Sequence, residues 1–169
     1  MSIFFHPPGS VIKSAYTQFT STNNITITEF ADTVFNDLTV NITPISTSSI
    51  IKLEAHIFGE FGNPGNPFNC MVFFYRDTTK LGHATAGNRA TGISSLCLTY
   101  HIANEDSTPE CGNYIYIDSP ATTSQITYKV GMRVTGESDI FYLNRTVNDV
   151  DTEDYERGIS TIIATEIAQ

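Results

Sequence analysis

Residues 126–135 read Ile-Thr-Tyr-Lys-Val-Gly-Met-Arg-Val-Thr, and this stretch decides the fold class. Every second position from Ile126 to Val134 is apolar, and the positions between them are polar or glycine. Successive side chains of a β-strand point to opposite faces of a sheet, so the alternation predicts a strand with one buried and one solvated face. A helix would require apolar residues at a period near 3.6, which this stretch does not have.

The same period of two recurs along the chain, and segments rich in Ile, Thr and Tyr raise the total to about ten expected strands. Clusters of Gly, Pro, Asn and Asp, such as 62–67 and 118–120, separate these segments. Their spacing of roughly 8–12 residues predicts an all-β fold, an antiparallel sandwich or barrel. Besides 126–134, the expected strands are 11–16, 25–30, 38–42, 51–57, 69–75, 96–102, 114–117, 140–144 and 161–167.

Length and charge limit the possible functions. With 169 residues the chain has the size of one domain, and we expect a single sandwich at 11–169 behind an extended N-terminal arm at 1–10. Its 18 acidic and 9 basic residues give a net charge of −9, so neither nucleic acid nor a membrane is an expected partner. The longest apolar run, Cys70 to Tyr75, is far shorter than the ~20 residues of a transmembrane helix. The N-terminus lacks the features of a signal peptide, and three cysteines suit reduced thiols in a cytoplasm.

The acidic segment 149–156 is the strongest candidate for a metal site, because alternate carboxylates in a tight loop can converge on calcium. It departs from the calcium-loop template, since Asp154 stands where glycine is required and Ser160 where a bidentate glutamate belongs. A solvated acidic loop, or a short helix at 148–157, is therefore the favoured interpretation.

No constellation of catalytic residues emerges from the sequence. Cys97 and His101 would lie ~13 Å apart on an extended strand, too far to share a zinc ion, so Cys97 and Cys111 are interpreted as buried or half-buried thiols. The chain contains no Gly-x-Ser-x-Gly motif and no glycine-rich phosphate loop. We therefore predict no enzyme activity, no catalytic or metal-binding residue and no cofactor. A glycosidase with two paired carboxylates is the remaining enzymatic alternative, although the sequence nominates no pair.

Four stretches combine strand and turn residues in a specific order: Pro8-Gly9-Ser10-Val11-Ile12, Ile42-Thr43-Pro44 running into 46–53, 116–124 leading into 127–130, and 158–167. Together they resemble small β-rich virion proteins, and fibre or knob modules, of tailed bacteriophages, notably phages of aquatic bacteria and cyanophages. The resemblance spans most of the chain. It implies a jelly-roll-like sandwich of about 8–10 strands, assembled as a homotrimer on the capsid or at the end of a fibre. The segments 58–69 and 149–156 look longer than the corresponding loops of compact modules.

The first function that the resemblance implies is capsid decoration, also called cement. The protein would be made in the host cytoplasm, bind major capsid protein on the virion surface as a trimer, and stabilise the joints between capsomers. No shaft or coiled-coil repeat is visible ahead of the sandwich, as expected of a free-standing cap. The apolar N-terminal tip could anchor on a neighbour, or it could cover the core of its own sandwich. The residues of this arm are Ile3, Phe4, Phe5, Pro7 and Pro8.

The alternative function is a tail or head fibre, or a receptor-binding knob, that recognises host surface glycan. Aromatic and polar side chains in long loops would make the contacts. Phe61, Phe68 and His83 are the candidates for these contacts. No attachment segment is visible in the sequence, although a trimeric partner could supply one.

Overall fold

The computed structural model describes residues 6–62, 70–95 and 107–169, and these residues form ten β-strands and no helix. Within them, therefore, no helical segment of the length and hydropathy of a membrane span occurs. The strands are β1 (Val11–Phe19), β2 (Asn23–Ile27), β3 (Thr33–Ile42), β4 (Ile50–Phe61), β5 (Cys70–Arg76), β6 (Thr79–Leu81), β7 (Glu110–Asp118), β8 (Ile126–Val134), β9 (Asp139–Leu143) and β10 (Ser160–Ile167). The all-β fold expected from the alternating pattern is confirmed.

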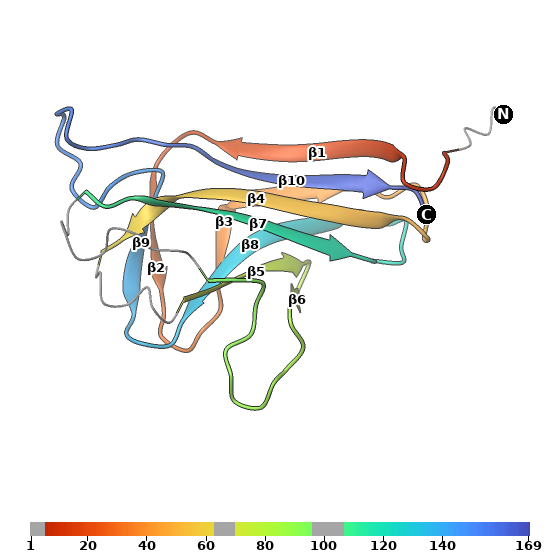
Figure 1. The fold of residues 1–169 in the computed structure, drawn as a ribbon, viewed down its shortest axis with the longest axis horizontal. Coiled ribbons are helices and arrows are strands. Elements are labelled where there is room, and N and C mark those ends of the chain that lie inside the picture. Colours follow the sequence, from red (N-terminus) through yellow and green to blue (C-terminus); the bar gives the residue numbers. More distant parts are fainter. Residues whose placement is uncertain (1–5, 63–69, 96–106) are drawn as a thin grey trace.

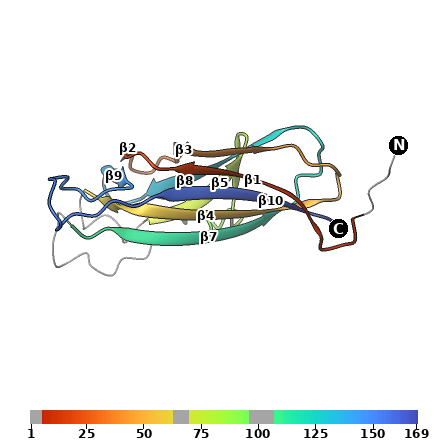
Figure 2. The same cartoon turned by 90° about the horizontal axis from the view of Figure 1, so that it is seen from above.

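The strands form two sheets that pack face to face (Figure 1, Figure 2). Sheet A runs β1-β10-β4, and β4 then pairs with β7 along most of its length and with β9 at its end, beside which lies β2. Sheet B runs β3-β8-β5-β6. Figure 1 looks onto sheet A, with sheet B behind it, and both ends of the chain lie at the same end of the sandwich.

The order of pairing is that of a jelly roll. Apart from the short strands β2 and β9, the first strand pairs with the last, β1 with β10, and the other pairs are nested inside: β3 with β8, β4 with β7, and β5 with β6. All four pairs are antiparallel. A long hairpin folded over into two sheets gives this order, so the jelly-roll-like sandwich is confirmed.

The core lies between the two sheets and follows the period of two. β8 runs from Ile126 to Val134, as the sequence predicts, and its five apolar residues are all buried. β4 and β10 alternate between buried and half-buried residues in the same way. Each large apolar side chain that is fully buried contributes about 1.5–3 kcal/mol to folding, so this alternation is what holds the sheets together.

Some elements differ from the sequence expectations. The short strand β6 (Thr79–Leu81) lies in a segment expected to be a loop, because three residues are too few to show a period. Residues 148–157 form turns and bends, that is, the acidic loop and not a short helix. The strand expected at 96–102, with Cys97, lies outside the described residues. The thiol of Cys111, expected to be buried or half-buried, is exposed, because its position in β7 faces away from the core.

The side chain of Asp118 joins the two sheets at one edge. Asp118 ends β7 of sheet A and accepts hydrogen bonds from Tyr128 Oη at 2.6 Å and from Arg76 Nη1 at 3.0 Å, both in sheet B. Burial, and then the hydrogen bond to this carboxylate, raise the pKa of Tyr128 far above its ordinary value. The buried tyrosine therefore stays protonated and serves as a donor that fixes how the sheets align.

Candidate functional site

The residues expected to form the N-terminal arm are only partly described. Residues 3–5 lie outside the described ranges, whereas Pro7 and Pro8 are described and exposed. The backbone N–H of Gly9 donates to the carbonyl oxygen of Ala168 at 2.8 Å, so the chain joins the sandwich directly after Pro8. The arm thus departs from the end of the sandwich that also carries the C-terminus (Figure 1).

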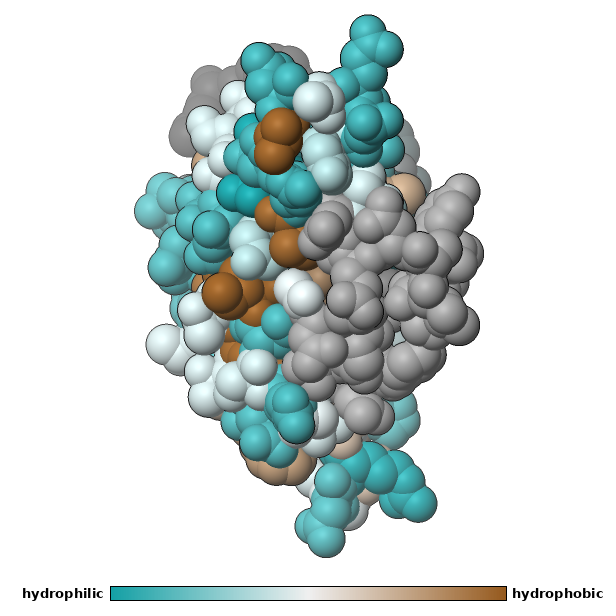
Figure 3. Space-filling model, turned by 90° about the vertical axis from the view of Figure 1, so that its left-hand side faces the viewer, coloured by the Kyte–Doolittle hydropathy of each residue, from teal (hydrophilic) through white to brown (hydrophobic). Residues whose placement is uncertain are grey.

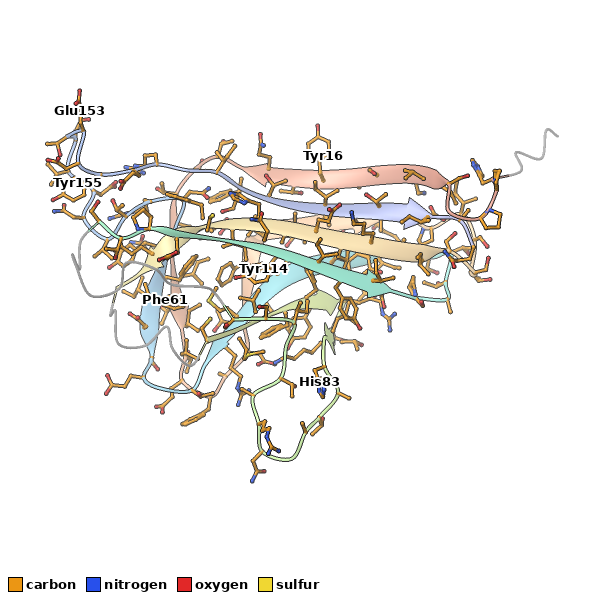
Figure 4. The ribbon with its side chains drawn as sticks, viewed as in Figure 1. Tyr16, Phe61, His83, Tyr114, Glu153 and Tyr155 are labelled. Carbon is orange, nitrogen blue, oxygen red and sulfur yellow. The ribbon has the colours of Figure 1, made fainter. Side chains whose placement is uncertain are left out.

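The three residues expected to contact a ligand from loops have different places. Phe61 ends β4 in the core: it is 4 % exposed and packs edge-on against Phe141, with ring centroids 5.1 Å apart (Figure 4). The expectation for Phe61 is therefore wrong, because its ring has no surface to offer. His83 is exposed in the loop after β6, where its Nδ1 lies 2.6 Å from the carbonyl oxygen of Ala84. Phe68 lies outside the described residues.

The acidic loop between β9 and β10 is held by its own ion pairs. Asp149 contacts Arg145 at 3.4 Å and also pairs with Arg157. Across the described part of the chain, no three His, Cys, Asp or Glu side chains gather in a group that could hold a metal ion. Figure 3 looks onto this end of the sandwich, where hydrophilic residues cover most of the described surface, and Figure 4 shows Glu153 pointing away from the protein. These observations fit the solvated acidic loop.

Glu60 is a buried acid with a structural set of partners. One carboxylate oxygen accepts hydrogen bonds from the backbone N–H and the hydroxyl of Thr108, at 2.7 and 2.6 Å. The other accepts from the backbone N–H of Val147 at 2.6 Å. The end of β4 is thereby tied to the segments that precede β7 and follow β9. A buried carboxylate whose oxygens all accept hydrogen bonds in this way holds neighbouring segments together.

The outer face of sheet A exposes several large apolar side chains among polar ones. The register of β1, β10, β4 and β7 arranges its side chains in three rows across the sheet. Within these rows Tyr16, Ile115 and Ile117 are 73 %, 58 % and 48 % exposed, and Figure 4 shows Tyr16 pointing away from the sandwich. The rows are Gln18-Thr161-His56-Asn113, Tyr16-Ile163-Glu54-Ile115 and Ser14-Thr165-Lys52-Ile117.

This outer face also carries no net charge at neutral pH. Its two charged side chains, Lys52 and Glu54, form an ion pair at 2.8 Å, and His56 shares a hydrogen bond of 2.9 Å with Asn113. A shallow hollow of about 240 Å³ lies among these side chains, bordered by Ile115. On a chain with a net charge of −9, a face without net charge that exposes several large apolar side chains has the character of an interaction site.

The outer face of sheet B is built differently. Phe73 of β5 points to this face and yet is fully buried, because Lys80 of β6 lies over its ring with Nζ 3.8 Å from the ring centroid. Beneath the ring, Gly131 of β8 supplies the space: a Cβ at that position would lie 2.4 Å from the ring of Phe73. The lysine is thus held over an aromatic platform by a cation–π contact.

Asp32 orders the cations on this face. Its carboxylate accepts hydrogen bonds from Lys80 Nζ at 2.9 Å, Tyr75 Oη at 3.1 Å and Arg133 Nη1 at 3.3 Å. Burial alone would raise the pKa of Asp32, but the hydrogen bonds and the charge of Lys80 outweigh it, so that pKa lies below its ordinary value. Burial, and then the neighbouring carboxylate, raise the pKa of Tyr75. The two cations are therefore fixed in place by an ionised acid.

Neither outer face was singled out by sequence reasoning. Ile115 and Ile117 alternate with Tyr114 and Tyr116, so both faces of β7 read as apolar. A strand with apolar residues at both its even and its odd positions has an apolar outer face as well as an apolar inner face, and such an outer face is available to a partner. The cations on sheet B come from separate strands, and no local pattern connects them.

Comparison with known proteins assigns no family. No protein-family model matches the chain, and no curated protein sequence matches it. The fold and the two outer faces are therefore the features that bear on the function.

Proposed function

We propose that this protein is a non-enzymatic structural protein of a bacteriophage virion, in first place a capsid decoration protein that assembles as a homotrimer. The observation that carries the proposal is the outer face of sheet A, which has no net charge and exposes Tyr16, Ile115 and Ile117 on an otherwise acidic jelly roll. In this role the protein is made in the host cytoplasm, binds major capsid protein on the outer surface of the particle and stabilises the joints between capsomers.

The chemistry of the sheet A face supports a second copy of the chain as its occupant. The cores of protein interfaces are enriched in aromatic and aliphatic side chains and depleted in charged ones, and Tyr16, Ile115 and Ile117 have that character. Two copies with a charge of −9 repel each other over most of their surfaces, but not where Lys52 and Glu54 cancel. A contact between this face and a different surface of the next copy closes into a ring, and the resemblance implies a ring of three copies.

The use of the buried acids supports a structural role over a catalytic one. Glu60 accepts three hydrogen bonds from Thr108 and Val147, and Asp118 accepts its bonds from Tyr128 and Arg76. A general acid or base needs an exchangeable proton within reach of a substrate. Both carboxylates are instead enclosed by groups that hold loops and sheets together.

The N-terminal arm supplies a second contact with the particle. Pro7 and Pro8 are exposed, and the chain leaves the sandwich ahead of Gly9. A variant that lacks residues 2–8 is expected to keep its jelly roll and its trimer, because the strands begin at Val11, but to lose binding to capsids. Cosedimentation of purified protein with undecorated capsids measures this loss. Unchanged cosedimentation would show that the arm covers its own sandwich.

The copy number in purified virions tests the decoration role directly. Decoration requires the protein in numbers comparable with those of the major capsid protein, which quantitative mass spectrometry of purified particles measures. A protein present only in the low numbers of tail or head fibres would contradict decoration. Its absence from purified particles would contradict any role in the virion.

A receptor-binding knob on a tail or head fibre is the second candidate function. The observation that favours it is the ordered set of cations on the outer face of sheet B, which lies on the opposite side of the sandwich from the sheet A face. A trimer closed through sheet A would leave this side free for a host surface. Labelling of fibre tips by an antibody against the protein, together with a low copy number, is the result that this role requires.

A further inference from the structure

An open hollow of about 440 Å³ lies on the outer side of sheet B. Strands β6 and β8 contribute Lys80 and Arg133, the turn after β2 contributes Phe30, and the rest of the lining comes from Thr135 and the loop 85–91. Sites for small molecules typically have volumes of about 300–1,000 Å³, so the hollow has room for a sugar unit with its substituents.

The hollow is cationic on an acidic protein. Three of the nine Lys and Arg residues line it, namely Lys80, Arg89 and Arg133, and no acidic residue is among the lining residues. Asp32, which does not line the hollow, forms ion pairs with Lys80 and Arg133. Arg89 forms no ion pair with any residue of the described ranges. The lining therefore carries three cations and no carboxylate, which favours anions locally.

The aromatic wall of the hollow is held in an unusual conformation. Phe30 has a φ of 56° and is 59 % exposed, although a bulky residue rarely adopts a positive φ. Its backbone N–H donates to the carbonyl oxygen of Val134 at 2.9 Å, which fixes it next to the end of β8. A large ring is thus presented to solvent at the rim of a charged hollow, by a strained backbone conformation.

We propose that this hollow binds an acidic saccharide, meaning a sugar that carries a carboxylate or a sulfate. Arg and Lys side chains form strong, charge-assisted hydrogen bonds with both anions, and Arg89 and Arg133 can do so through two nitrogens at once. The ring of Phe30 offers an apolar surface to the C–H face of a sugar. Hydroxyl and amide groups of Thr85, Asn88 and Thr91 suit the hydroxyls of the sugar.

Two of the cations in this hollow are held in fixed positions before any ligand binds, which distinguishes the hollow from an ordinary charged surface. Lys80 is held by Asp32 at 2.9 Å and by the ring of Phe73, and Arg133 is held by the same carboxylate. Side chains that are already ordered lose little entropy when a ligand arrives. Arg89 adds a third cation for the anion, and the ring of Phe30 favours an anion that is attached to a sugar.

This inference deepens the second candidate function, yet its test is separate from the copy-number test. Binding of an acidic saccharide would stand even if the protein proved to decorate capsids, because the hollow lies on the side away from sheet A. Failure to bind would remove the glycan ligand and leave the structural role untouched.

The test is titration calorimetry of the full chain with trigalacturonate, a sulfated disaccharide, maltotriose and inorganic sulfate. We expect one of the two acidic sugars to bind at least about tenfold more tightly than maltotriose and than sulfate, which corresponds to about 1.4 kcal/mol. Arg89→Ala and Phe30→Ala each remove an exposed side chain and should each weaken that binding by about tenfold. Only Arg89→Ala should also weaken the binding of inorganic sulfate.

Lys129→Ala provides the matched control, since Lys129 is a cation on the same sheet face that does not line the hollow. It should leave the affinity within about twofold of the parent chain, a difference of less than 1 kcal/mol. Circular dichroism melts confirm that all three variants are folded. The proposal is overturned if neither acidic sugar binds, if inorganic sulfate or maltotriose binds as tightly, or if Lys129→Ala weakens binding as much as Arg89→Ala.

Discussion

The outer faces of sheets A and B are built from the same alternating strands, yet they differ in what covers their outward residues. On sheet A, Tyr16, Ile115 and Ile117 point outward and remain exposed. On sheet B, Phe73 points outward and is fully buried beneath Lys80. An outward position in a strand is therefore not the same as an exposed one. Which outward residues remain available to partners depends on cross-strand neighbours and on loops.

The largest expected effect distinguishes the outer face of sheet B, where Phe73 is buried, from the outer face of sheet A, where Tyr16 is exposed. Phe73→Ala removes a fully buried ring and should lower the free energy of unfolding by about 3–5 kcal/mol. Tyr16→Ala removes an exposed ring and should change it by less than about 0.5 kcal/mol when the chain is monomeric. Urea unfolding at low protein concentration measures both. Equal losses would mean that the two faces do not differ in this way.

A smaller effect concerns the acid that orders the cations of sheet B. The folded pKa of Asp32 lies below its ordinary value of 3.8, so the unfolded chain takes up the proton first. The contribution of Asp32 is complete above about pH 4 and disappears as the pH falls below 3.8 through the folded pKa. Asp32→Asn should cost up to about 1 kcal/mol at pH 7, because water screens this partly exposed group.

The measurement for Asp32 is a comparison of stability against pH. The gap between the parent chain and Asp32→Asn should narrow as the pH falls below 3.8. A matched change on sheet A, Glu54→Gln, alters an exposed ion pair with Lys52 and should cost less at pH 7. A gap for Asp32→Asn that does not narrow anywhere below pH 3.8 would show that the carboxylate does not stabilise the fold through its charge.

The smallest expected effect is the loss of stability when one hydroxyl group is removed from the outer face of each sheet, and this loss should be similar on both. Each face has a polar cross-strand pair: Ser14 and Thr165 on sheet A, at 2.9 Å, and Thr127 and Asn41 on sheet B, at 2.7 Å. Such pairs contribute about 0.2–1 kcal/mol. Ser14→Ala and Thr127→Val should therefore reduce stability by similar amounts in thermal unfolding. A much larger loss on one sheet would indicate that the hydroxyl groups, too, distinguish the faces.

The architecture was largely predictable from the sequence, because the period of two is a local property. The segment from Ile126 to Val134 gives the bounds of β8 directly, and the alternating segments near it gave most of the other strands. The three-residue strand β6 was not predictable, since pairing with β5 defines it and no pattern of its own does.

The candidate sites were less predictable, because they depend on contacts across the fold. Phe61 looked like a loop residue beside a run of Gly, Asn and Pro, but it packs on Phe141, which is far away in the sequence. Lys80 and Arg133 come together only through Asp32. The exposed aromatic Phe30 carried no signal either, because its positive φ is set by a hydrogen bond to Val134.

The central claim, self-assembly through the outer face of sheet A, is tested most directly by the molar mass in solution. Light scattering coupled to size-exclusion chromatography should give a trimer for the parent chain and a monomer for Ile115→Asp, which places a charge on β7, the edge strand of the neutral face. Asn41→Asp adds the same charge to the outer face of sheet B at an exposed position and should remain a trimer. A monomeric parent chain, or an Ile115→Asp variant that is still a trimer, would contradict the account.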